Sequence, residues 1–153
     1  MLAQLGDARL PENALCFEVT ETAAIANLSH VVHCIKTLRA QGCKFALDDF
    51  GSGLSSLTYL KNLPVDYLKI DGSFIRNVNR DSADHTVVEA IARMASALGI
   101  ETIAERVESE EVMTRLGQLG ICYVQGYHIA GPRPVAELPE LRRAREVEEE
   151  NQD

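Results

Sequence analysis

Short apolar runs alternate along the chain with longer segments in which apolar residues recur every three or four positions. Strand side chains alternate in direction, whereas helical side chains return to one face every 3.6 residues. The short runs therefore predict strands and the longer segments predict helices between them. The predicted strands are residues 15–20, 45–47, 66–71, 100–107 and 121–125, and the predicted helices run from about 28 to 38, 55 to 60, 84 to 98 and 109 to 119.

Three of the predicted strands begin just after a helix-ending glycine and finish at a polar residue. The three segments read QGCKFALD, LGIETIAE and LGICYVQ, and their polar ends are Asp48, Glu105 and Gln125. This weak repeat of helix, glycine, strand and polar end predicts successive βα units in an α/β fold. Such units form parallel sheets with right-handed crossovers, and functional groups gather at the carboxyl ends of the strands.

Parallel βα units either close into a barrel or remain an open, doubly wound sheet. The sequence contains no GxGxxG or GxxxxGK[ST] phosphate loop, which weakens the open nucleotide-binding sheet. A mouth ringed by side chains from many strands favours a (β/α)₈ barrel of the TIM type. Because about five units fit in the chain, whereas a complete barrel takes ~250 residues, we expect an incomplete barrel, with a shorter open sheet as the alternative.

Acidic and amide side chains stand at or just beyond the end of every predicted strand. A single pair such as Asp48 and Asp49, followed by Gly51 and Gly53, could be only a solvated turn. Repetition at several strand ends is difficult to explain by stability, because the carboxylates repel one another. The side chains are Glu18 and Glu21, Asp48 and Asp49, Lys69 and Asp71, Glu105 and Glu108, and Gln125.

Clustered carboxylates indicate a site for hard divalent cations, Mg²⁺ or Mn²⁺, which take oxygen ligands. Two such ions could clamp a phosphodiester and lower the pKa of an attacking water. Lys69, on the same strand face as Asp71, could orient that water or balance the negative charge. The alternative is a Schiff-base lysine of an aldolase-like barrel, which is disfavoured because neighbouring carboxylates keep a lysine protonated.

The composition is that of a soluble globular protein, with 46% hydrophobic and 25% charged residues. The net charge of −8 argues against nucleic acids and anionic membrane surfaces as partners. Half of that charge comes from residues 137–153, and residues 138–153 are expected to form a polar helical tail after a domain spanning 1–137. No apolar run approaches a membrane span and no signal peptide is recognisable, so a cytoplasmic location is expected.

The four cysteines form no CxxC pair and are expected to be reduced packing residues. His30, His33 and Cys34 fall on one helical turn and could in principle bind zinc, although no partner cluster supports such a site.

The motifs at the strand ends, taken in order, resemble those of EAL-domain cyclic-di-GMP phosphodiesterases over nearly the whole chain up to about residue 137. They are FEVTE at 17–21, DDFGSGLSSL at 48–57, LPVDYLKID at 63–71, AERVES at 104–109 and VQGYHIAGP at 124–132. The resemblance implies a (β/α)₈ barrel, two Mg²⁺ or Mn²⁺ ions, and hydrolysis of cyclic-di-GMP to the linear dinucleotide in bacterial signalling.

The resemblance also implies roles for individual residues. Lys69 would hold the attacking water and Glu105 would be the general base. Glu21 would anchor the loop of Phe50, Gly51, Ser52 and Gly53, which in the family links the site to dimerisation. The metal ligands would be Glu18, Asp48, Asp49 and Asp71, and Glu108 and Gln125 would complete the site.

Two departures from the family pattern stand out. Arg106 occupies a position, between the two glutamates of AERVE, where the family often has glycine. The namesake Glu-Ala-Leu segment and a later asparagine, both metal ligands, would precede the FEVTE strand. We therefore expect a partial EAL domain over residues 1–137, slow or inactive by itself, with an unpaired strand edge near Leu15 that favours a homodimer or another oligomer. An upstream regulatory domain and a membrane tether of the parent protein are both compatible with this view.

Two functions remain in competition at this point. The first is a metal-dependent cyclic-di-GMP phosphodiesterase. The second is a non-catalytic module that binds cyclic-di-GMP or a protein partner, as degenerate members of the family are thought to do.

Overall fold

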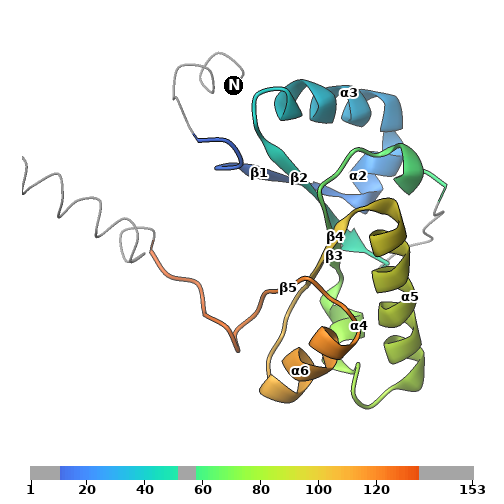
Figure 1. Ribbon diagram of the computed structural model, residues 1–153, viewed down its shortest axis with the longest axis vertical. Coiled ribbons are helices and arrows are strands. Elements are labelled where there is room, and N and C mark those ends of the chain that lie inside the picture. The colour runs from blue at the N-terminus through green and yellow to red at the C-terminus, as the bar shows by residue number, and fades with distance from the viewer. Residues whose placement is uncertain (1–10, 52–57, 135–153) are drawn as a thin grey trace, which may run out of the picture.

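The computed structural model of the chain describes residues 11–51 and 58–134. Its centre is a five-stranded sheet in which neighbours along the chain are neighbours in space, in the order β1-β2-β3-β4-β5, and every pairing is parallel (Figure 1). This arrangement confirms the predicted α/β class with successive βα units. The strands are β1 (Cys16–Thr20), β2 (Lys44–Phe50), β3 (Tyr67–Ile70), β4 (Glu101–Ala104) and β5 (Tyr123–Val124).

Helices follow the strands and are arranged around one side of the sheet, from α3 at the top of Figure 1 through α5 to α6 at the bottom. Each α-helix begins at a side-chain cap: for example, Asn27 accepts a hydrogen bond from the His30 amide, and Ser109 accepts one from the Val112 amide. The helices are α2 (Glu21–Ala26), α3 (Leu28–Arg39), the 3₁₀ turn η1 (Leu60–Asn62), α4 (Gly72–Arg76), α5 (Ser82–Leu98) and α6 (Glu110–Gln118).

Several predicted boundaries of strands and helices were wrong by a few residues. The error at the end of β4 bears on function. The strand predicted at 100–107 ends at Ala104, because Arg106 adopts a positive φ of 54° that extended pairing does not allow. The five-residue helix α4 was not predicted, since it is too short for apolar periodicity to reveal it. Half of the helical stretch predicted at 55–60, and the whole tail at 138–153, lie outside the described residues.

The core lies between the sheet and its helices. Leu47, Leu68 and Ala104 are fully buried on three adjacent strands, and the helices cover them with apolar side chains at helical spacing. The central strands, buried on both faces, read as nearly continuous apolar runs, which is typical of parallel sheets. The helical residues in this core include Ile35, Leu38, Val88, Ile91, Ala95 and Leu116.

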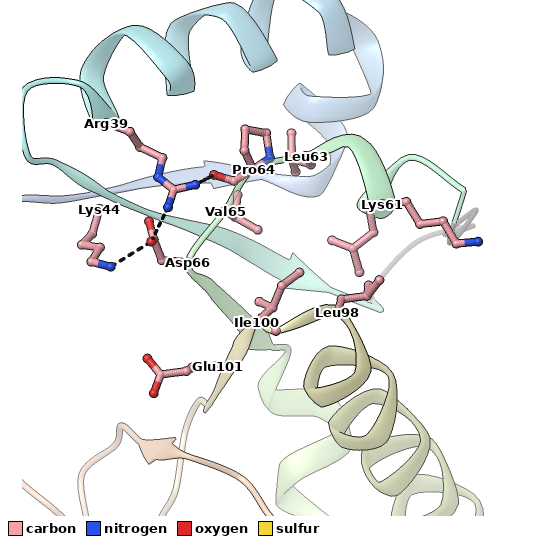
Figure 2. A pocket seen from close by; sticks show the side chains of 12 residues that line it. Arg39, Lys44, Lys61, Leu63, Pro64, Val65, Asp66, Leu98, Ile100 and Glu101 are labelled. Carbon is pink, nitrogen blue, oxygen red and sulfur yellow. Dashed lines mark hydrogen bonds and ion pairs between the residues drawn. The ribbon is translucent and has the colours of Figure 1, made fainter.

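The amino ends of the strands are joined by Asp66, which directly precedes β3. Its Oδ2 accepts a hydrogen bond of 2.9 Å from the Phe45 amide of β2. Its Oδ1 is 2.9 Å from Lys44 Nζ and 3.1 Å from Arg39 Nη2 (Figure 2). A cavity of about 450 Å³ opens beside this cluster, lined by charged side chains such as Lys61 and Glu101 and by apolar ones such as Leu63. Asp66 thereby fixes the register of β2 and β3 and the end of α3.

The expectation that all four cysteines pack in the interior was wrong for three of them. Cys43 is buried, whereas Cys16, Cys34 and Cys122 are exposed. Their apolar sequence neighbours do not determine which face of a strand or helix a cysteine occupies. Within 11–51 and 58–134, the three residues of the possible zinc site, His30, His33 and Cys34, do not form a metal-binding group. No helix in these two ranges has the length and apolar character that a membrane crossing requires.

Candidate active site

The carboxylate pair of DDFG lies at the carboxyl end of β2, where the strand becomes irregular. The pairing of β2 with β3 shifts register between Leu47 and Phe50, and Asp49 adopts a φ of 57°. The Asp49 amide donates a hydrogen bond of 3.0 Å to Oδ1 of Asp48. Aspartate tolerates this left-handed conformation better than most residues do. The irregularity removes the usual alternation of side chains and brings both carboxylates to the same site.

Glu105, at the end of β4, completes an acidic group with this pair. One carboxylate oxygen from each of Asp48, Asp49 and Glu105 lies within 4.8 Å of the other two, and all three side chains are partly exposed. This spacing suits a shared cation, and oxygen donors alone suit Mg²⁺ or Mn²⁺ better than softer metals. The donor set therefore fits a hard divalent cation, which is the class of metal that the sequence predicts.

Lys69 lies beneath these carboxylates and is only 3% exposed. Its Nζ is 2.8 Å from Oε2 of Glu18, 2.9 Å from Oδ1 of Asp48 and 2.8 Å from Oε1 of Glu105. Burial lowers the pKa of Lys69, but hydrogen bonds to the three carboxylates outweigh it and hold the pKa above its ordinary value. Lys69 is therefore a permanent cation at the centre of the site, which does not suit the Schiff-base alternative.

Within the described residues, Glu18 and Asp71, expected as metal ligands, are not among the carboxylates that meet this mutual spacing. Glu18 reaches Lys69 from β1, and half of its side chain is exposed. Asp71 caps α4, since its Oδ1 accepts a hydrogen bond of 2.9 Å from the Ser73 amide. Hydrogen bonding to Ser73 lowers the pKa of Asp71, and the charge of Arg106 lowers it further. The structure thus groups Glu105, expected as the base, with Asp48 and Asp49.

Glu21 is buried at the first position of α2, with 4% of its surface exposed. Its Oε1 accepts a hydrogen bond of 2.6 Å from the Tyr59 hydroxyl, and its Oε2 accepts one of 3.3 Å from the Gly51 amide. The carboxylate therefore holds both ends of the loop that follows DDF. Ser52 and Gly53, in the expected dimerisation loop, lie outside the described residues, and Phe50 is buried in the core. Sequence reasoning missed Tyr59, which no motif marks as the partner of Glu21.

One cavity adjoins the acidic group through Glu105, and a second shares only Arg106 with the first. The first, of about 470 Å³, is lined by Glu105, Arg106 and Gln125 together with residues 126–127 and 130–132. The second, of about 350 Å³, is lined by Arg106 and Glu108 together with the residues that follow α4 and the start of α6. Gln125 and Glu108, expected to complete the site, therefore lie in different cavities, and Arg106 borders both. The first cavity has the size of a small-molecule site.

Comparison with known proteins gives a consistent result. Residues 1–132 match the family model of the EAL domain. Over 127 residues the chain is 47% identical to the cyclic di-GMP phosphodiesterase PdeB of Shewanella oneidensis, a match that covers 83% of this chain and 15% of that protein. The chain thus spans a small part of this relative's length.

Solved structures of EAL domains have the same fold. The FimX EAL domain from Pseudomonas aeruginosa bound to c-di-GMP matches with a TM-score of 0.79 and 32% identity, covering 85% of this chain and 53% of that one. The EAL domain of Mycobacterium smegmatis DcpA matches with a TM-score of 0.82 and 34% identity, covering 91% of this chain and 62% of that one. The chain spans a little over half of each of these structures.

Proposed function

The chain belongs to the EAL domain family, and on that premise we propose that its acidic site hydrolyses cyclic-di-GMP to the linear dinucleotide. The observation that carries the proposal is the buried Lys69, held by Glu18, Asp48 and Glu105 beside a group of carboxylates that could bind a divalent cation. The names of the relatives supply the substrate, because PdeB is a cyclic di-GMP phosphodiesterase and the FimX EAL domain was solved with c-di-GMP.

Asp48 and Asp49 would hold Mg²⁺ or Mn²⁺, with Glu105 close enough to join them. When bound, the metal would supply positive charge that neutralises the phosphodiester and favours deprotonation of a water. Both metals suit the oxygen donors, and the choice between them is part of the test. Glu18 and Asp71 remain proposed further ligands.

In the proposed reaction Lys69 exchanges one of its three carboxylate contacts for a hydrogen bond to the attacking water, and the remaining carboxylates keep it protonated. Glu105 accepts the proton that the water loses as its oxygen bonds to phosphorus. The phosphorus–oxygen ester bond to the neighbouring ribose breaks, and the leaving oxygen takes a proton from solvent. The product carries one phosphomonoester, one new hydroxyl and the phosphodiester that was not hydrolysed. Gln125, in the cavity beside Glu105, is proposed to contact the nucleotide.

The direct test incubates the full chain with cyclic-di-GMP and Mn²⁺ or Mg²⁺ and separates the linear product by chromatography, and the expected turnover is slow, below the ~1 s⁻¹ that is usual for enzymes. Glu105→Gln should abolish turnover and retain binding of the dinucleotide, whereas the matched variant Glu89→Gln, on the exposed surface of α5, should behave like the wild type. Turnover that Glu105→Gln leaves undiminished would refute the assigned role of Glu105. Binding without turnover in either metal would favour the non-catalytic module.

A cytoplasmic location and a homodimer belong to the same proposal. The location is supported by the proposed substrate, a nucleotide of bacterial signalling, and the homodimer by the family resemblance of the loop that begins at Phe50. Light scattering of the chain at several concentrations, with and without cyclic-di-GMP, tests the homodimer.

A further inference from the structure

Arg106 is held in a conformation that an arginine rarely adopts. It follows Glu105 at the end of β4 with a φ of 54°, in the left-handed region. The next residue, Val107, is fully buried, and its amide and carbonyl are bonded to the carbonyl of Gln125 and the amide of His128. Because the backbone after Arg106 is fixed in this way, the residue cannot relax to an extended conformation without breaking those bonds.

The side chain of Arg106 lies across Gly72, which follows Asp71 at the end of β3. A β-carbon placed on Gly72 would be 2.4 Å from Cδ of Arg106 and 2.7 Å from its Cγ. Real side chains do not approach so closely. The stem of Arg106 therefore occupies the space that any side chain at position 72 would need, and the two positions form a complementary pair.

This placement puts a cation on the border of the cavity that contains Glu105 and of the neighbouring cavity. Arg106 borders the cavity that contains Glu105 and Gln125, and within the described residues it is the one lysine or arginine that does so. Arg76 and Arg80 border only the other cavity. Among residues 11–51 and 58–134, Arg106 makes no direct ion pair, although its charge acts on Asp71, whereas Lys69 is occupied by three carboxylates.

Cyclic-di-GMP carries two phosphodiesters, each with one negative charge. If one is hydrolysed at the acidic group, the other needs a separate positive partner, and a guanidinium binds phosphate oxygens through two parallel hydrogen bonds. We propose that Arg106 binds the phosphodiester of cyclic-di-GMP that is not hydrolysed, and that Gly72 admits the arginine side chain to that position. This inference rests on the proposed function.

The experiment measures equilibrium binding of cyclic-di-GMP to the full chain by calorimetry in Ca²⁺, with chromatography to detect turnover. Arg106→Gln should weaken binding about tenfold, as expected for loss of a hydrogen bond to a charged group, and Arg106→Lys should weaken it less. Arg80→Gln, the matched loss of an arginine that borders only the second cavity, should change binding by less than about twofold. Arg106→Gly, which suits the positive φ, should melt no lower than the wild type and bind as weakly as Arg106→Gln.

Two further comparisons distinguish the phosphate contact from a general effect of charge. Gly72→Ala should weaken binding in the wild type but have no further effect in Arg106→Gly, because the glycine lacks the side-chain carbons that the alanine would displace. Cyclic GMP, with a single phosphodiester, should bind Arg106→Gln and the wild type within about twofold of each other.

The outcomes are distinct. Equal binding of cyclic-di-GMP by Arg106→Gln and the wild type would overturn the inference and leave the proposed function standing. An equal loss in Arg80→Gln, or an equal loss for cyclic GMP, would also overturn it, since either result points to general charge or to another contact. A wild-type chain that binds no cyclic-di-GMP would refute the proposed function and the inference together.

Discussion

The hydroxyl of Tyr59 donates a hydrogen bond of 2.6 Å to the buried carboxylate of Glu21, which also accepts a hydrogen bond from the Gly51 amide. Burial raises the pKa of Tyr59, and its hydrogen bond with the charged Glu21 raises it further, so the hydroxyl keeps its proton. The two contacts join Tyr59 and Gly51 to the first residue of α2. The strength of the Tyr59–Glu21 contact can be measured because each partner has a conservative replacement.

Tyr59→Phe should lower the free energy of unfolding by about 1 to 3 kcal/mol, because it leaves one oxygen of a buried carboxylate without its donor. Urea unfolding followed by circular dichroism measures the change. Tyr123→Phe is the matched control, since its hydroxyl contacts Glu101 at 3.3 Å on the surface, and about 0.5 kcal/mol or less is expected there. Equal losses in the two variants would contradict a special role for the Tyr59–Glu21 contact.

Asp66→Ala should destabilise the chain by about 1 to 3 kcal/mol through the unpaired Phe45 amide. Arg39→Ala removes a partially exposed partner of the same carboxylate and should cost less than about 1 kcal/mol. Hydrogen exchange of the Phe45 amide gives a local measurement beside global unfolding. Exchange unchanged in Asp66→Ala would show that the carboxylate does not protect this amide.

Lys69→Met should destabilise the chain by about 3 kcal/mol, since it removes the cation shared by Glu18, Asp48 and Glu105. Added Mn²⁺ should then raise the melting temperature of Lys69→Met more than that of the wild type, because a bound cation offsets the same repulsion. EDTA should reverse the increase in melting temperature in both Lys69→Met and the wild type. Asp49→Asn should reduce the Mn²⁺ effect, whereas Asp84→Asn, in the first turn of α5, should not.

The carboxyl of Asp71 gives a prediction for acid pH. Its pKa is below the ordinary 3.8, mainly through hydrogen bonding to Ser73, so its ionised form stabilises the folded state. That contribution is complete above the ordinary pKa and is lost as pH falls through the lowered one. The difference in unfolding free energy between wild type and Asp71→Ala in EDTA should therefore be constant from pH 7 to about 5 and shrink below 3.8. A difference that grows on acidification would reverse the assigned sign.

The sequence was sufficient to predict the parallel sheet and the meeting of Asp48, Asp49 and Glu105. Each follows an apolar run, and the carboxyl ends of parallel strands share one edge of a sheet. The central position of Lys69 also follows from alternation along β3. These inferences depend only on periodicity and strand direction, which are local properties of the chain.

The features that were missed depend on tertiary geometry. Tyr59 and Glu21 are 38 positions apart, and their contact requires α2 to begin at Glu21. The left-handed backbone of Arg106 is set by bonds that the following residue makes to the segment after β5. Glu105 joins the acidic pair of Asp48 and Asp49 more closely than Glu18 does. This difference depends on side-chain directions, which regular strand pairing does not determine.

The two ends of the sheet differ in regularity. At the amino ends, Asp66 bonds to Phe45 and the pairing is in register. At the carboxyl ends lie two of the three described non-glycine residues with positive φ, Asp49 and Arg106, and the register shift of β2. Tolerance to substitution should therefore differ between the two ends of the strands. A library selected for heat resistance is best confined to the amino ends, and one selected for altered ligand preference to the carboxyl ends.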